Sequence, residues 1–403
     1  MNSLTEPSGS HRIKFALILG SLATIGPLSI DMYLPAFPII AEDLGTNASL
    51  VQLSLTFFLL GLSLGQLVVG PFSDIRGRRI PLLIGLLVYS SASLLCALSP
   101  SIEALLFFRF AQGLAGSAGI VLSRAIVRDL YSGSELTKFF SLLMLVNGLG
   151  PILAPIIGAK VLQFTSWHGV FVVLSIVGTI LLITVSFWLP ETLPKERRMT
   201  GGFKGTIRTF RQLLANRTFM GYAISQGLVF ASMFAYISGS SFVFQNVFGV
   251  TPQMYSYIFA LNGLGIILAT QVTGRLAGRI GETTLLMIGL RMSALGGSIL
   301  LIMLLLKASL FAVLPPLFFV VSSVGVVNTA GFSLAMQTQS KVAGSAAALL
   351  GVTSLLIAGL FAPLVGLGGS HTALPMGIVI ACSSACSVLA YTVLVREKKQ
   401  EAA

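Results

Sequence analysis

The chain has 403 residues, of which 55% are hydrophobic and only 9% are charged, and its mean hydropathy is +0.93. Soluble domains carry about 25% charged residues, so this chain has too few to cover a surface in water. The net charge of +12 does not indicate nucleic-acid binding, because the basic residues lie in short segments between apolar runs, where they set orientation in a membrane.

Twelve apolar segments approach or exceed the roughly 20 residues that a helix needs to cross a bilayer. They cover residues 14–40, 49–72, 80–98, 102–127, 138–163, 168–189, 218–247, 253–276, 283–306, 310–336, 342–366 and 372–394. Backbone polar groups in lipid must be satisfied within the segment, which favours helices. We therefore predict an all-α integral membrane protein with twelve transmembrane helices in two six-helix halves.

The distribution of Lys and Arg predicts the orientation. Odd-numbered gaps between the spans contain only Lys160 and Lys307 as strong bases, whereas the even-numbered gaps and both tails hold the remaining cations outside the spans. Cytoplasmic segments carry this excess of positive charge. We expect a multi-pass protein of the cell membrane with both termini in the cytoplasm.

The longest polar stretch, residues 191–217, divides the chain into an N-terminal half, residues 1–190, and a C-terminal half, residues 218–403. Its basic part, around residues 204–211, predicts either a short amphipathic helix at the inner membrane surface or a solvated linker without a lipid role. The halves also look related, because Gly274, Gly278 and Gly281 repeat a glycine and aspartate pattern of the first half at an offset of 204 residues. Parallel repeats of this kind are found in transporters.

Asp31 and Arg109 are the strongest candidates for chemistry, because ionisable residues inside apolar spans are functional candidates by default. Rises of about 1.5 Å per residue put both at similar depth, roughly 12–14 Å below the outer end of their spans. A carboxylate that alternates between an Arg partner and an apolar environment can take up and release a proton. The alternatives are a permanent ion pair that holds two helices together, and an Asp31 that binds a substrate cation.

The loop predicted between the second and third spans is charged and contains Gly70, Asp74, Gly77 and Arg78. The two glycines allow a tight turn, and Asp74 can accept hydrogen bonds from an Arg or a helix N-terminus. We expect Asp74 to favour one conformation of the two halves through a contact near the cytoplasm. Arg124, Arg128 and Asp129 lie at the inner end of the fourth span, where they either form a charge network with Asp74 or provide a simple positive anchor.

The fifth span contains the small residues and prolines of Asn147–Ala159, including Pro151, Pro155 and Gly158. Small residues allow close helix packing, and prolines favour a kink. We group these three residues with the loop as candidates for a conformational switch.

A binding pocket needs apolar walls and a few polar groups. The candidates for contacting a substrate are Tyr33, Asn147, Gln226, Phe230, Phe234 and Asn262. For any single one of them, a place in the protein core or against lipid is the more ordinary explanation.

Three of these stretches resemble motifs of the major facilitator superfamily. The loop reads G-x-x-x-D-x-x-G-R-R and resembles motif A, although Ile75 stands where a basic residue is usual. Arg109-x-x-Gln112-Gly113 resembles motif B, and the fifth span resembles motif C of antiporters, with Ala154 and Ala159 in place of glycines. Nearly the whole chain resembles the bicyclomycin-resistance (Bcr/CflA) branch of the drug:proton antiporters. The resemblance implies export driven by inward proton flow.

We therefore expect a proton-coupled antiporter that exports small amphipathic compounds. A metabolite exporter, for sugars or amino acids, is the alternative on the same fold. An enzyme is not expected, because Asp31 is the only deep acid and no His lies deep in a span. We expect no cofactor and no metal, and as partners a small-molecule substrate, protons and the lipid bilayer, with no nucleic acid and a monomeric state.

Overall fold

The computed structural model describes residues 9–131, 133–198, 204–337, 339, 343–369 and 371–396, and over these residues it contains helices and no strand. The helices of the first half are α1 (Gly9–Asp31), α2 (Phe37–Asp43), α3 (Ala48–Arg76), α4 (Arg79–Ala97), α5 (Ile102–Leu130), α6 (Gly133–Phe164) and α7 (Trp167–Trp188). Those that follow are α8 (Lys204–Ala215), α9 (Arg217–Phe242), α10 (Pro252–Ile280), α11 (Glu282–Leu305), α12 (Leu310–Gln337), α13 (Ala343–Phe361) and α14 (Leu374–Tyr391).

The predicted fold class is confirmed. Eleven helical segments in the described part of the chain are long and apolar enough to span a membrane, and the apolar stretch Leu149–Phe164 of α6 supplies a shorter one. Large apolar side chains point outward from the bundle, among them Phe107, Phe187 and Phe311, which are 65%, 80% and 80% exposed. Such side chains are stable when the surrounding solvent is lipid rather than water.

Short polar side chains begin several of these helices. The side chain of Asn47 accepts a hydrogen bond from the Leu50 N–H at the start of α3 (2.9 Å), Asn216 accepts one from Phe219 at the start of α9 (3.0 Å), and Thr251 accepts one from Met254 at the start of α10 (3.3 Å). Each satisfies a backbone donor that has no partner within the helix.

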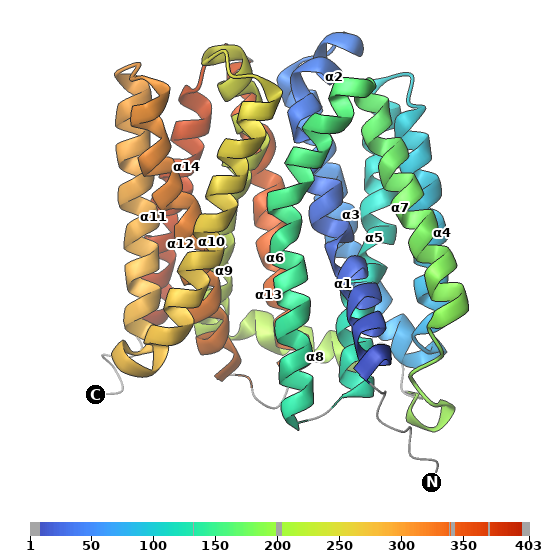
Figure 1. Ribbon diagram of the computed structural model, residues 1–403. Helices are drawn as coiled ribbons and strands as arrows, with labels where there is room; N and C mark the ends of the chain where they lie inside the picture. Colours follow the sequence, from blue (N-terminus) through green and yellow to red (C-terminus); the bar gives the residue numbers. More distant parts are fainter. Residues whose placement is uncertain are drawn as a thin grey trace.

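The helices form two groups that stand side by side (Figure 1). In the first group α3 packs on α5, α4 packs on α5 and α7, and α1 packs on α6. In the second, α9 packs on α13 and α14, α10 packs on α12, and α11 packs on α12 and α14. Helix α8 crosses between the groups at the end of the bundle where both termini lie. We call this the terminal end and the opposite one the distal end.

The repeat predicted from the glycines is visible in α3 and α10. Both helices have 29 residues, and each ends at a glycine with positive φ, Gly77 (φ 92°) and Gly281 (φ 79°). A side chain rarely adopts this backbone conformation, which explains the glycine at both ends.

Apolar packing joins the halves at the distal end and leaves them separate at the terminal end. One cluster contains Phe37 and Val51 of the first half together with Phe242 and Tyr255 of the second. Towards the terminal end there are two clusters, one built only from first-half residues and one only from second-half residues.

Two local expectations are corrected. The first span is not one helix to residue 40, because α1 ends at Asp31 and is followed by a 3₁₀ turn, Leu34–Ala36, and the short helix α2. Gly70 does not form a turn, since α3 continues through it to Arg76 and a Cβ there would meet only Val121 at 3.9 Å. Apolar length predicts that a segment spans, but it does not locate a break inside the span.

Candidate functional site

Asp31 is the last residue of α1 and lies where the helix is interrupted. Its side chain is 4% exposed, and its Oδ1 has no hydrogen-bond partner among the described residues. Pro35 contributes to the interruption, because it lacks the N–H that would bond to the Asp31 carbonyl in a continued helix. A buried carboxylate without a partner is costly when ionised, so this position is unusual for a purely structural residue.

Helix α6 packs directly on this interruption. A Cβ at Gly158 would collide with the carbonyl oxygen of Met32, and a Cβ at Gly150 would come within 3.0 Å of Pro27 on α1. Pro151 and Pro155 both lie inside α6, which continues through them. The glycine and proline pattern of the fifth span therefore fits α6 against the segment that carries Asp31.

Arg109 of α5 is fully buried and is held between aromatic rings. Its Cζ lies 4.3 Å from the ring centroid of Tyr33 and 4.3 Å from that of Phe58, with the Phe171 ring at 5.7 Å. We call Tyr33 and Phe58 the aromatic clamp. A desolvated cation–π contact stabilises by about 2 kcal/mol or more. The Tyr33 and Phe58 rings therefore offset part of the free-energy cost of burying the Arg109 charge.

Polar contacts fix Arg109 and the aromatic clamp in place. One Arg109 NH group donates to Gln112 Oε1 (2.5 Å), and Gln112 Nε2 donates to Ser93 Oγ (2.8 Å). The Tyr33 hydroxyl lies 3.1 Å from Ser54 Oγ on α3. The Arg109 Nε and the second NH group have no hydrogen-bond partner within the part of the chain that the structure describes.

Asp31 and Arg109 form no ion pair in this conformation; the ion pairs among the described residues lie at the terminal end. Tyr33 follows Asp31 by two residues and occupies one face of the guanidinium. The two charged groups are thus linked through a three-residue segment, Asp31–Tyr33, rather than through a direct contact.

Asp31 interacts electrostatically with two tyrosines of the second half, Tyr236 of α9 and Tyr255 of α10. The Tyr236 hydroxyl accepts a hydrogen bond from Asn262 Nδ2 (3.1 Å), and the Tyr255 hydroxyl lies 3.3 Å from Ser240 Oγ. Asp31 therefore belongs to the interface between the halves, with Asn262 in its second-half environment.

Three of the other substrate candidates lie on α9, and the fourth, Asn147, belongs to α6. Gln226 donates a hydrogen bond to Asn328 of α12, and its own Oε1 is buried without a partner among the described residues. Phe230 stacks on Phe234 with centroids 6.2 Å apart. The side chain of Asn147 lies outside the described residues, although its backbone belongs to α6.

At the terminal end, Arg78 joins two acids of different helices. It donates to Asp74 of α3 (2.5 Å), to Asp129 of α5 (2.8 Å) and to Ser73 (2.7 Å). Arg128 is exposed and makes no contact in this network among the described residues. Of the residues expected to join a charge network with Asp74, the structure places Asp129 there through Arg78 and leaves Arg128 outside it.

Glu191, just after α7, caps the start of α4 from another part of the chain. Its carboxylate accepts from the N–H groups of Arg78 (2.8 Å), Arg79 (3.3 Å) and Leu193 (3.0 Å), and it lies 3.7 Å from Arg198. Partial burial raises the pKa of Glu191, but these donors and the Arg198 charge outweigh it, so the pKa lies below its ordinary value. A Cβ at Gly77 would collide with this carboxylate.

Among the described residues, six hydrogen bonds join the halves, and all have a neutral side-chain donor and a backbone carbonyl acceptor. The pairs, donor first, are Ser49–Pro363, Gln52–Ser238, Thr56–Gly359, Ser241–Leu34, Gln245–Pro35 and Ser256–Pro155, at 2.6–3.3 Å. We call this set the distal closure. No comparable bond joins the halves near α8 or the termini within the described ranges.

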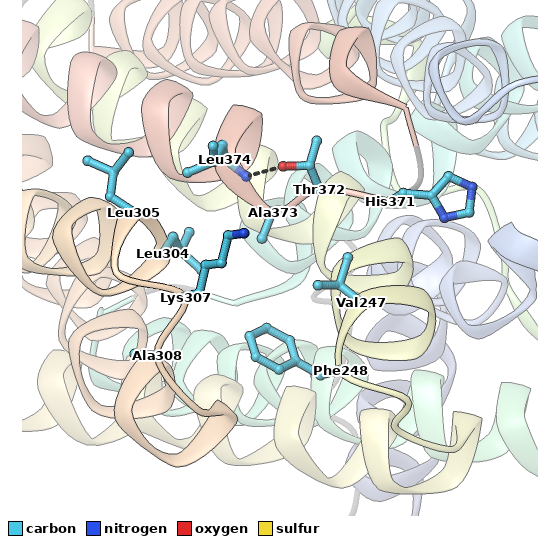
Figure 2. Close-up of a pocket in the computed structure, with 10 residues that line it drawn as sticks. All are labelled: Val247, Phe248, Leu304, Leu305, Lys307, Ala308, His371, Thr372, Ala373 and Leu374. Carbon is cyan, nitrogen blue, oxygen red and sulfur yellow. Dashed lines mark hydrogen bonds between the residues drawn. The ribbon is translucent and has the colours of Figure 1, made fainter.

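A hollow of about 370 Å³ lies at the distal end of the second half and is separate from Asp31 and Arg109. Figure 2 shows Lys307 directed into it, with Phe248 and Leu304 nearby and Thr372 accepting a hydrogen bond from Leu374. Its walls are otherwise mostly apolar, and none of the predicted site residues lines it.

Sequence comparison decides the family. The Major Facilitator Superfamily profile matches residues 19–363. A Bacillus subtilis protein named as an uncharacterised MFS-type transporter, YdgK, is 45% identical over 98% of each chain, and a Haemophilus influenzae protein named as a bicyclomycin resistance protein homologue is 33% identical over 94% of this chain and 95% of its own.

This chain belongs to the Major Facilitator Superfamily. It is a multi-pass membrane transporter and not an enzyme. A solved structure of a bacterial homologue of the human lysosomal transporter Spinster, described as inward-facing and unoccupied, has the same fold, with a TM-score of 0.71 at 16% identity over 97% of this chain and 96% of that one.

The contacts that could be predicted from the sequence are those made by residues of the superfamily motifs. Asp74, Gly77 and Arg78 meet at one place, and Gly158 contacts the segment after Asp31. The roles of Phe58 and Glu191 were not predicted from the sequence. Phe58 is one of 27 phenylalanines and carries no local signal, whereas Glu191 directly follows a span and stands near basic residues, which is a weak signal for a helix cap.

Proposed function

We propose that this transporter is a proton-coupled antiporter that exports small amphipathic compounds from the cytoplasm by alternating access. We place it in the cell membrane with both termini in the cytoplasm, as the distribution of Lys and Arg favours. Its similarity to a protein named for bicyclomycin resistance supports drug-like substrates.

The observation that carries the proposal is the Asp31 carboxylate. It is buried at the interruption of α1, interacts electrostatically with two tyrosines of the second half, and has an oxygen without a partner among the described residues. A carboxyl group in such a place can hold a proton and release it when its surroundings change. Arg109 of α5, which contacts the Tyr33 ring two residues after Asp31, is the cation that can favour the ionised form of Asp31.

Alternating access follows from the way the halves meet. We propose that residues 1–190 and 218–403 move as two bodies joined by the linker 191–217. With the termini in the cytoplasm, the distal closure faces outward, so the conformation described here opens to the cytoplasm. Opening to the outside then requires the six bonds of the distal closure to break.

We propose that substrates bind between the halves, near Tyr33, Asn147, Gln226, Phe230, Phe234 and Asn262. Aromatic and apolar walls with a few amide groups suit compounds that are mainly apolar and carry a few polar atoms. Asp74, Gly77, Arg78, Arg128, Pro151, Pro155 and Gly158 remain the proposed switch residues, whereas Gly70, which lies within α3, is no longer one of them.

The Asp31→Asn variant tests the proposal, since Asn keeps the shape of the side chain but cannot bind and release a proton. Cells with and without the protein are first exposed to toxic compounds, bicyclomycin among them, to find a substrate. Uphill accumulation of that substrate in vesicles with an imposed pH gradient is then measured. We expect Asp31→Asn to abolish it, while Glu103→Gln, which removes an exposed carboxylate of α5, leaves it unchanged. Full proton-driven transport by Asp31→Asn would refute the proposal.

A further inference from the structure

Arg109 is an unusual buried cation, because its charge meets ring faces instead of a carboxylate. The Tyr33 and Phe58 centroids lie at equal distances of 4.3 Å, and two of its N–H-bearing nitrogens have no hydrogen-bond partner in the described part of the chain. Buried charges are normally paired. A side chain held in this way is stable while the rings stay in place, and it is ready to bind an anion when one ring moves away.

The ring most closely linked to Asp31 is Tyr33. Only Met32 separates the two residues, and all three lie at the interruption after α1, where the backbone is not held by a regular helix. Tyr33 is anchored to α3 by Ser54, and Phe58 lies one turn further along that helix. A shift of this segment that carries the Tyr33 ring off Arg109 also moves the Asp31 carboxylate.

We propose that Tyr33 and Phe58 are positioning residues for the proton-coupling step, which hold Arg109 on their ring faces and apart from Asp31 while the distal closure is formed. The inference rests on the proposed function, in which Asp31 carries the proton. Departure of the Tyr33 ring exchanges a cation–π partner of Arg109 for the Asp31 carboxylate, and this exchange favours release of the proton.

The titratable groups around the two residues are few. Tyr89 and Cys96 of α4 interact electrostatically with Arg109, as does Tyr33 itself. Tyr236 and Tyr255 of the second half interact electrostatically with Asp31. Arg109 is the one cation among these groups, so we attribute a change in the titration of Asp31 on altering the aromatic clamp to Arg109.

The test measures the titration of Asp31 directly and does not depend on transport. A hydrophobic carbodiimide reacts with protonated carboxylic acids, so labelling of the purified protein at a series of pH values gives the midpoint at which Asp31 loses its proton. The label is located by mass spectrometry of the Asp31 peptide, and Asp31→Asn shows the background.

Loss of a ring should free Arg109 to pair with Asp31. We expect Tyr33→Leu and Phe58→Leu to move the labelling midpoint to lower pH by about one unit or more. Tyr33→Phe keeps the ring face but removes a hydroxyl that also interacts with Arg109, so its midpoint should move less than that of Tyr33→Leu. Phe219→Leu, which removes an equally buried ring near the terminal end, should also leave the midpoint unchanged.

A fluorinated series at Phe58 keeps the shape of the ring and weakens its negative face. Successive fluorine atoms should lower the midpoint stepwise if the ring acts through its charge distribution. Midpoints that stay at the value of the Phe219→Leu control, or that rise, would overturn the inference even where the leucine variants fail to fold. If Asp31→Asn transports normally, the antiport proposal fails, and the labelling midpoints still decide whether the aromatic clamp separates the two charges.

Discussion

Glu191 stabilises the start of α4 although it lies 113 residues away from Arg78 in sequence. A helix N-terminus has backbone N–H groups without partners and a partial positive charge. A carboxylate accepts hydrogen bonds from the N–H groups, and its negative charge is attracted to the positive one. Because Glu191 also pairs with Arg198, one side chain connects α4 to the segment after α7. This contact strengthens the terminal end of the first half.

The stabilisation by Glu191 should depend on pH. Its pKa is lowered in the folded protein, so the contribution is fully present above the ordinary pKa of a glutamate, about 4.3, and is lost as pH falls through the lower folded value. We expect Glu191→Gln to reduce stability at pH 7 by about 1 kcal/mol, as for other caps. The difference between the variant and the unaltered protein should shrink below about pH 4.3.

Thermal unfolding of the protein in detergent at several pH values measures this effect. Glu196→Gln is the matched control, because Glu196 is an exposed carboxylate on the same segment. An equal loss of stability for Glu191→Gln at all pH values would show that the shape of the side chain, rather than its charge, matters.

For single residues, the sequence identifies the functional candidates but not the side chains that contact them. An Asp and an Arg in apolar spans are easily recognised as functional candidates, because few other charges lie so deep. Their partners are not recognisable, since Phe58 and Ser54 reach Tyr33 and Arg109 only through the packing of α1, α3 and α5. Opposite charges at similar depth suggest an ion pair, whereas packing here favours aromatic faces.

Helices α1 and α6 show how one missing Cβ determines a contact between elements. Gly158 lets α6 approach the carbonyl of Met32, next to the candidate proton site. Gly70 was predicted to be equally special, but it lies within α3 with open space around it. Both are glycines in superfamily motifs, so only the structure separates the two roles.

Alanine substitutions should separate them in experiment. Gly158→Ala forces a methyl group against the Met32 carbonyl, so we expect a loss of about 1–3 kcal/mol in stability and a large loss of transport. Gly70→Ala adds a methyl group in open space within a helix and should be neutral or stabilise by up to about 1 kcal/mol. Unfolding temperature and transport in vesicles measure both effects, and equal behaviour of the two variants would contradict this account.

The elements themselves were largely predictable, because a run of about 20 apolar residues has few other stable conformations. The matched ends of α3 and α10 followed from the spacing of Gly77 and Gly281. The prolines near Asp31 indicate that the helix is disrupted there, but they do not fix the residue at which it ends. Packing against α6 is what settles the local structure there.

Across the whole molecule, two of the six bonds of the distal closure end on carbonyls that stand four residues before a proline. Pro363 has no N–H for the Gly359 carbonyl, and Thr56 of the first half donates to it instead. Pro38 likewise cannot donate to Leu34, whose carbonyl accepts from the Phe37 N–H within the 3₁₀ turn and from Ser241 of the second half. Interruptions in the helices of one half thus supply some of the acceptors for the other.

Weakening the distal closure should shift the conformational equilibrium. Each neutral hydrogen bond contributes about 1 kcal/mol, so loss of two by Ser241→Ala with Gln245→Ala should shift the population about thirtyfold towards the conformation open at the distal end. Distances between spin labels at the distal and terminal ends report the shift. Ser240→Ala is the matched control, because Ser240 bonds only within the second half. Unchanged distances in the double variant would contradict this role.

The chemistry of the distal closure also limits how it can change during evolution. Every residue type supplies a main-chain carbonyl, so substitutions on the acceptor side leave the oxygen in place. Only the six donor side chains can lose a bond by a point mutation, three of them on one face of α3 and three in the second half. Residues around the acceptors can therefore change as the transported compounds change. The ability to form the distal closure depends on the six donor positions alone.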